Sequence, residues 1–269
     1  MNRSAVLAAF NQQVRQSTTP DGTGASFEAG PHVVRRIAQP GLGGSGVLWS
    51  SLDGSDADEV IAEQVAFFRA RGEEFEWKLY SYDEPADLAD RLRAAGFVAE
   101  EPESLMIAAI AEITDALSSA ELPAGVRLER ATDEAGVDLL IRVHDQVFGE
   151  DGSEMRAELL TQLGDAPETT DMVIAMAGDE PVSAARTDFL PGRQFAGLWG
   201  GGTLPQWRRR GIYRALVKIR ADRAAERGYS YLTVDASDQS RPILERIGFE
   251  CLAVTTPYNW SAGGSRVAG

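Results

Sequence analysis

The residues best suited to chemistry in this chain are three consecutive arginines, Arg208, Arg209 and Arg210, followed by Gly211. The apolar spacing after Gly211 predicts a helix, so these cations lie at a helix N-terminus. Positive charge opposes the helix dipole there, at a cost of about 0.3–1 kcal/mol per charge. First-turn N–H groups, a glycine that lets a ligand approach the backbone and forked guanidinium donors together predict a pyrophosphate site.

The charge of the rest of the chain makes this cluster stand out. The 269 residues have a formal net charge of −15, yet basic residues gather between positions 208 and 227. They are Arg208, Arg209, Arg210, Arg214, Lys218, Arg220, Arg223 and Arg227. A solvated basic helix would show the same pattern, and this alternative stays open. Overall acidity argues against nucleic acid and anionic membranes as partners and favours cationic ones.

The second half of the chain has the pattern of a mixed α/β domain. The predicted elements are a strand at 126–130, helices at 132–148 and 153–163, strands at 172–177, 182–189 and 195–204, a helix at 211–227, a strand at 229–234, a helix at 240–247 and a strand at 249–258. Hairpins followed by strand, helix, strand, helix and strand predict an α+β fold with one mixed sheet.

The first half has fewer predicted elements. They are a helix at 1–16, a loop at 17–31, strands within 32–52, a helix at 57–71, a strand at 75–82, a helix at 86–95 and a strand at 104–110. Residues 111–125 have no clear periodicity. We therefore predict domains at 1–112 and 125–260, a linker at 113–124 and a disordered tail at 261–269.

An internal repeat links the two halves. In both, a helix ending in glycine leads into a strand, a further helix and a Gly-Phe pair, at 96–97 and again at 248–249. This repetition predicts that one supersecondary unit occurs twice. Coincidence of common helix-stop glycines is the alternative.

These features resemble the GNAT superfamily of N-acetyltransferases, whose signature is Gln/Arg-x-x-Gly-x-Gly/Ala after a strand. Arg208 and Gly211 match its first two fixed positions, whereas Tyr213 replaces the final small residue. The closing segment 242–249 resembles the C-terminal helix and strand of the family. The resemblance covers 126–258 in full and the first half as a degenerate copy. It implies two GNAT-like mixed-sheet α/β domains in tandem, the C-terminal one complete.

The resemblance also implies a donor and a reaction. The expected donor is acetyl-CoA, with its acetyl group passing to a primary amine in a direct ternary complex. The implied CoA-binding residues are Gly202, Thr203, Leu204, Arg208, Arg209, Arg210, Gly211, Ile212, Tyr213 and Arg214. The first three match positions that bind the pantetheine arm in a gap between two strands. A plain β-bulge is the alternative explanation of Gly200–Gly202.

The catalytic groups remain unknown. The family often supplies a carboxylate base on the strand before the phosphate site, but the matching stretch is Leu198-Trp199-Gly200. Its usual acid is a tyrosine on the last helix, where Leu244 stands here. Remaining candidates for moving protons are Tyr213, Tyr258, Asp235, His144 and water. The predicted acceptor-binding residues are Trp199, Tyr258 and His144. Two alternatives follow: a non-catalytic CoA-binding protein, or an aminoacyl or longer-chain acyl transferase.

The first copy lacks the arginines. Where they should precede the helix, the chain carries Asp53, Asp56, Asp58 and Glu59, which would repel a pyrophosphate. These carboxylates are instead suited to a helix N-terminus. We therefore predict one coenzyme site, in the second half. The first domain is then structural or forms part of the acceptor pocket.

Several classes of protein are disfavoured by composition. With Cys251 as the only cysteine, no intramolecular disulfide can form, and two histidines make a metal site improbable. No apolar run reaches the roughly 20 residues of a membrane helix. The N-terminus does not sustain a signal-peptide core, so the expected location is the cytoplasm. The expected state is a monomer, as an intramolecular pseudo-dimer, or a homodimer.

Overall fold

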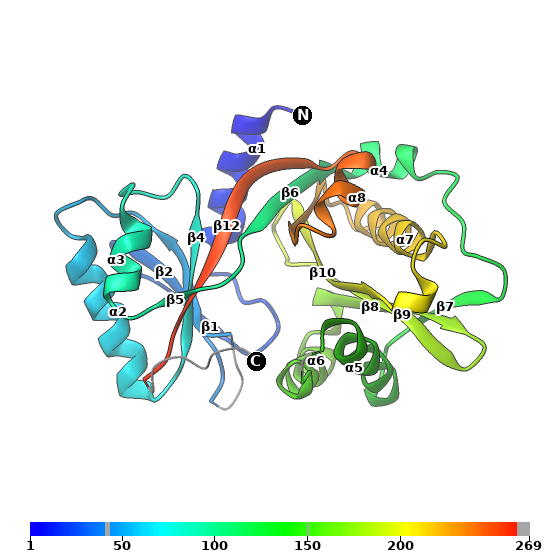
Figure 1. Cartoon of the computed structure of the whole chain (residues 1–269), viewed down its shortest axis with the longest axis horizontal. Helices are drawn as coiled ribbons and strands as arrows, with labels where there is room; N and C mark the ends of the chain where they lie inside the picture. The colour runs from blue at the N-terminus through cyan, green and yellow to red at the C-terminus, as the bar shows by residue number, and fades with distance from the viewer. Residues whose placement is uncertain (41–43, 150, 263–269) are drawn as a thin grey trace.

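The computed structural model of the chain describes residues 1–40, 44–149 and 151–262 (Figure 1). The tail predicted to be disordered, 261–269, lies outside the described residues from 263 onward. None of the helices in the described ranges is long and apolar enough to cross a membrane.

The elements of the first half follow the predicted order, with three additions. They are α1 (Arg3–Phe10) with a π-helical turn at Asn11–Arg15, β1 (Ser26–Ala29), β2 (Val33–Ile37), β3 (Gly46–Ser50), α2 (Ala57–Arg71), β4 (Phe75–Tyr80), α3 (Leu88–Ala94), β5 (Val98–Ala99), β6 (Glu103–Ala109) and α4 (Ile110–Ala116). The additions are β1, which lies in the predicted loop, β5, and α4, which extends into the predicted linker. Helix α4 has only 7 residues, too few for its apolar period to stand out. It forms because Ile113 and Leu117 are buried on the core beneath it.

The second half has the elements that the sequence predicts. They are β7 (Val126–Arg130), α5 (Glu134–Phe148), α6 (Ser153–Asp165), β8 (Thr170–Ala177), β9 (Glu180–Asp188), β10 (Phe195–Thr203), α7 (Ile212–Glu226), β11 (Tyr231–Ala236), α8 (Arg241–Arg246) and β12 (Glu250–Trp260). Strong periodicity and glycine stops explain the agreement, since both act locally.

The strands join in one 12-stranded sheet with the order β1-β2-β3-β4-β12-β6-β11-β10-β9-β8-β7, and β5 pairs with β12. The two halves exchange strands: β12, the last strand, pairs with β4, whereas β6 of the first half pairs with β11. Figure 1 shows β12 leaving α8 and running beside β4. The halves predicted from chain order, 1–112 and 125–260, therefore share one continuous sheet.

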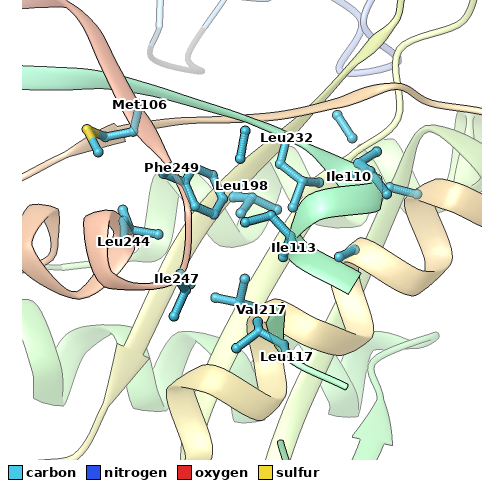
Figure 2. Close-up of a cluster of buried hydrophobic side chains, with 14 of the residues drawn as sticks. Met106, Ile110, Ile113, Leu117, Leu198, Val217, Leu232, Leu244, Ile247 and Phe249 are labelled. Carbon is cyan, nitrogen blue, oxygen red and sulfur yellow. The ribbon is translucent and has the colours of Figure 1, made fainter. Parts of the chain in front are cut away.

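The helices divide between the two faces of the second half of this sheet. Helices α4, α7 and α8 cover β6, β10 and β11 with a buried core that includes Leu198, Val217 and Leu244 (Figure 2). We call this side the α7 face. Helix α5 packs on β8, β9 and β10 from the opposite side, which we call the α5 face. Because side chains alternate along a strand, Phe195, Gly197 and Trp199 belong to the α5 face.

Helix α1 and the first-half helices complete the layers. Helix α1 packs on the α5 face, where Val6 and Phe10 contact Tyr80, Ile107 and Phe195. Helices α2 and α3 cover β4 from the other side, over Phe75, Trp77 and Leu92. The core under α7 fixes the start of this helix just after the end of β10. Arg208, Arg209 and Arg210 therefore lie where β10 ends.

Candidate functional site

The site begins with a gap between two neighbouring strands. Strands β10 and β11 pair in parallel only from Phe195 to Gly197, with Tyr231 to Thr233 as partners. Beyond Gly197, β10 continues to Thr203 and β11 to Ala236 without pairing with each other. Backbone groups that face the gap have no ladder partner. An extended ligand with amide groups could pair there as an added strand does.

A β-bulge in β10 opens this gap. The register with β9 shifts between Trp199 and Gly202, and Gly200 has a φ of +57°. A bulge bends its strand and increases the local twist, which carries β10 away from β11. Gly200–Gly202 do form a β-bulge, as the alternative interpretation had it. The same bulge opens the gap that makes the candidate site.

The glycines of the bulge are not equivalent. A Cβ atom at Gly200 would meet nothing within 4 Å, whereas one at Gly202 would lie 2.9 Å from Val147 Cγ1 of α5. The missing side chain of Gly202 thus makes room for α5 and not for a ligand. Its carbonyl accepts a hydrogen bond of 2.6 Å from Ser183 Oγ. Thr203 and the buried Leu204 follow, and Leu204 N–H donates to Val182 O at 2.9 Å.

A tight turn connects β10 to α7. A 3₁₀ turn at Pro205–Trp207 leads into Arg208, whose Nε donates to Thr203 O at 3.0 Å. We call Arg208–Gly211 the arginine turn. Arg209 has a φ of +62° and Gly211 a φ of +87°. Left-handed residues in a turn direct successive N–H groups into one concavity, a geometry that suits anions. A non-glycine residue in this conformation is strained, as functional turns often are.

The donors of the arginine turn are available. The side chains of Arg208, Arg209, Arg210 and Arg214 are exposed, and none forms an ion pair with a described residue. Nor do the backbone N–H groups of residues 209–214 donate to any carbonyl in the described part of the chain. Arg210 lies over the Trp207 ring, with Cζ 4.7 Å from its centroid. The predicted phosphate-binding positions are therefore brought together with unused donors.

Two predicted CoA-binding residues turn their side chains inward. Ile212 is buried against β8 and β9, and Tyr213 packs on the α7 core. Burial raises the pKa of Tyr213 and Arg220 counteracts part of this shift, so the phenol stays protonated at neutral pH. Only the backbone N–H groups of Ile212 and Tyr213 are placed to face a ligand at the helix start.

Arg220 has a role that the sequence did not reveal. It was named among the basic residues that gather at 208–227, but only 1% of it is exposed, and no described carboxylate pairs with it. Its Nε donates to Leu216 O at 3.1 Å, and its Nη2 would lie 3.6 Å from a Cβ atom on Gly201. Burial lowers the pKa of the guanidinium. Arg220 thus supports the bulge from beneath, and its place on the apolar stripe four residues after Leu216 was the available signal.

The predicted acceptor residues do not all meet. Trp199 is 44% exposed on the α5 face, beside the gap. His144 lies on α5, the helix that packs on this face, with Nδ1 3.4 Å from Asp145 Oδ1. Tyr258 is buried in the core of the first half, opposite Trp77 in the β12–β4 ladder. Tyr258 was predicted to bind the acceptor with Trp199, but the structure does not bring the two together, because β12 crosses into the other half of the sheet.

The α5 face supplies titratable groups near the closed end of the gap. Asp188 of β9 is opposite Gly197, the last β10 residue paired with β11. Burial raises the pKa of Asp188 to about 6, although Arg186 lowers it in part. Asp235 of β11 lies on the other side of the gap, and its Oδ2 is 2.6 Å from Lys78 Nζ. Leu198 and Leu244 are both buried and apolar, so neither can move a proton.

The comparisons with known proteins agree with this geometry. Residues 146–261 match the family model described as the acetyltransferase (GNAT) domain. A search of curated proteins finds no match.

Solved structures resemble the chain over most of its length. A GCN5-related N-acetyltransferase from Kribbella flavida has a TM-score of 0.66 and 17% identity, covering 97% of this chain and 95% of that one. A tandem GNAT protein from the clavulanic acid biosynthesis pathway has a TM-score of 0.62 and 11% identity, covering 98% and 95%. At these identities the likeness is one of fold. Residues 146–261 therefore belong to the acetyltransferase (GNAT) domain family, and the chain as a whole shares the fold of solved GNAT proteins, a tandem one among them.

Proposed function

We propose that this protein transfers an acetyl group from acetyl-CoA to a primary amine, in one step within a ternary complex. One observation carries the proposal: four guanidinium groups that form no ion pair with a described residue lie beside the end of β10, where it has separated from β11. The first-turn N–H groups next to them donate to no carbonyl of the described residues. Phosphate needs donors of this kind, and the adjoining gap suits the amide groups of a pantetheine arm.

The residues divide the binding of CoA between them. The arginine turn and Arg214 would hold the pyrophosphate, with backbone N–H groups of Gly211, Ile212 and Tyr213 as further donors. Gly202 ends the bulge, and Thr203 and Leu204 connect it to the 3₁₀ turn before Arg208, along the expected path of the pantetheine arm. The thioester would then lie near Trp199, where β10 and β11 begin to separate. CoA supplies the activated acyl group.

The reaction depends mainly on holding the amine and the thioester in the right orientation, and less on particular catalytic side chains. The neutral amine nitrogen forms a bond to the thioester carbonyl carbon while the carbon–sulfur bond breaks. The amine loses one proton, the departing thiolate takes up one, and the products are the amide and free CoA thiol. Unpaired N–H groups of β10 are suited to stabilise the negative charge that develops on the carbonyl oxygen. Holding the amine beside the thioester supplies much of the remaining acceleration.

A second candidate, CoA binding without catalysis, has its own supporting observation. The stretch where the family often has a carboxylate base is Leu198-Trp199-Gly200, and the position of its usual acid holds the buried Leu244. A third candidate, transfer of an aminoacyl or longer acyl group by the same fold, concerns only the donor.

Thiol release from acetyl-CoA, measured over a panel of primary amines, separates transfer from mere binding. We expect amine-dependent release, with initial-rate lines that intersect when both substrates are varied. Parallel lines would contradict the ternary complex. Calorimetric CoA binding without release for any amine would favour the second candidate. Competition between acetyl-CoA and longer acyl-CoA donors tests the third.

A further inference from the structure

A group of charged residues occupies the α5 face beside the gap. Strand alternation puts Glu76 and Lys78 of β4, Glu103 of β6 and Asp235 of β11 on this face. Lys78 Nζ lies 2.6 Å from Asp235 Oδ2 and 3.7 Å from Glu103 Oε2. We call these four residues the Lys78 cluster. It lies at the ends of the strands that are farthest from α1.

The sheet is bent towards this cluster. Strands β4 and β11 are separated by β12 and β6, so three strand spacings of about 4.8 Å would lie between them in a flat sheet. A lysine and an aspartate side chain could not meet over that distance. The Lys78–Asp235 contact therefore requires a concave face. Asp235 also lies two residues beyond Thr233, the last residue of β11 that pairs with β10.

The cluster has an excess of negative charge. Three carboxylates, those of Glu76, Glu103 and Asp235, face one ammonium group, that of Lys78. Burial raises the pKa of Glu76 and that of Glu103, and Lys78 counteracts only part of either shift. A further cation at this place would offset the electrostatic cost of holding these carboxylates ionised.

Hydrogen-bonding capacity is also unused here. Thr255 of β12 is 0% exposed, and its Oγ1 has no partner among the described residues. Its register with Tyr80 and Glu103 puts it on the α5 face, within the cluster. Asp235 Oδ1 is likewise buried without a described partner. Buried polar atoms are nearly always hydrogen-bonded to protein or ordered water, so these two atoms add unused acceptors and a donor to the polar surroundings of the cluster.

We propose that the acceptor is a dicationic amine, whose second cationic group binds to the Lys78 cluster while its reacting amine lies at the gap. This inference rests on the proposed function. Carboxylates keep a nearby amine protonated and so non-nucleophilic. The cluster therefore suits the group that is not acylated. Glu76 and Glu103 are the specific contacts. Asp235 holds Lys78 at 2.6 Å, whereas Glu103 lies 3.7 Å from this ammonium group. Glu76 forms no ion pair with a described residue.

Three probes that share a butyl chain and a terminal primary amine test this proposal: diaminobutane, butylamine and aminobutanoate. Their far ends are positive, apolar and negative. Calorimetric binding to the full chain is measured with and without CoA, together with thiol release from acetyl-CoA. We expect diaminobutane to bind about tenfold or more tightly than butylamine, since a charge-assisted hydrogen bond is worth that factor. Aminobutanoate should be the weakest.

A double variant and a control test whether the preference for diaminobutane comes from Glu76 and Glu103. Glu76→Gln with Glu103→Gln should remove most of the preference for diaminobutane and leave CoA binding unchanged. The control is Glu59→Gln, an exposed carboxylate on α2, which should behave as the parent does. Thermal unfolding shows whether the double variant is folded.

The outcomes separate this inference from the proposed function. Equal binding of the three probes, or a preference that persists in the double variant, overturns the dication site and leaves CoA binding intact. If the parent fails to bind CoA, the proposed function is overturned and the cluster loses its role as an acceptor site. Tighter binding of diaminobutane that depends on Glu76 and Glu103, with CoA bound, supports both.

Discussion

Two helices hold equivalent places in the two halves of the molecule, yet their N-termini are opposites. Helix α2 connects the parallel strands β3 and β4, and α7 connects the parallel strands β10 and β11. Each helix has 15 residues. Each helix therefore begins at the carboxyl end of the strand before it. Because β4 runs antiparallel to β11 in the shared sheet, the two helix N-termini lie at opposite edges of the sheet.

The start of α2 is closed by its own carboxylates. Asp53 Oδ1 accepts from Ser55 N–H at 2.7 Å and from Asp56 N–H at 3.2 Å, and Asp56 Oδ1 accepts from Asp53 N–H at 2.8 Å. Asp58 pairs with Arg91 at 2.9 Å. The start of α7 has cations and unused N–H groups instead. One fold therefore supports either a helix that supplies its own anions or a helix that needs an external one.

The largest expected effect is loss of CoA binding when the arginine turn is truncated. Arg208→Ala with Arg210→Ala removes two charged donors, each worth about 1.5–3 kcal/mol. Calorimetry should show affinity for CoA lower by about a hundredfold or more. Arg246→Ala, an exposed arginine on α8, is the matched control. Unchanged affinity for CoA in the double variant would show that the start of α7 does not bind an external anion, and so does not differ in this from the start of α2.

A smaller effect is expected at Arg209, which combines strain with charge. Glycine tolerates a positive φ, so Arg209→Gly should raise the free energy of unfolding by up to about 1 kcal/mol. The same variant should bind CoA more weakly, because one guanidinium is lost. Urea denaturation and calorimetry measure the two quantities. A lower free energy of unfolding in this variant would show that the Arg209 side chain stabilises the folded state.

The cap of α2 should respond to pH. Hydrogen bonds from Ser55 lower the pKa of Asp53 in the folded protein. The stabilisation is therefore present above the unfolded pKa of about 4 and is lost as pH falls through the folded value. Asp53→Ala should lower the melting temperature at pH 7 and have no effect once Asp53 is protonated in both states. A difference that persisted at low pH would mean that the carboxylate charge is irrelevant.

No effect on CoA binding is expected when the charge at the start of α2 is reversed. Asp53→Lys with Asp56→Lys reverses charge at α2, but titration should still give one CoA per chain with the parental affinity. A stoichiometry near two in the parent, or weaker binding in this variant, would show that the first copy takes part in CoA binding.

Local patterns were enough to predict the elements and the arginine turn, but not the arrangement of the strands. Glycine stops and helical periods predict α2 and α7 closely, because these signals depend on neighbouring residues. The pairing of β12 with β4 depends on contacts between distant segments, and so Tyr258 was assigned to the wrong half. Lys78 and Asp235 meet for the same reason. Spacing in the sequence carries no signal of a contact between strands that two others separate.

The pairing of β4 with β12, the last strand, also means that the sheet can be completed only at the end of protein synthesis. When β4 leaves the ribosome, its neighbour β12 has not yet been made, so that edge of the first-half sheet stays unpaired for most of translation. Unpaired edges invite association with other chains. The first half can complete its core of Trp77, Tyr258 and Trp260 only after the whole second half has been synthesised. A nascent chain of this protein is therefore expected to depend on protection at β4 until its last strand emerges.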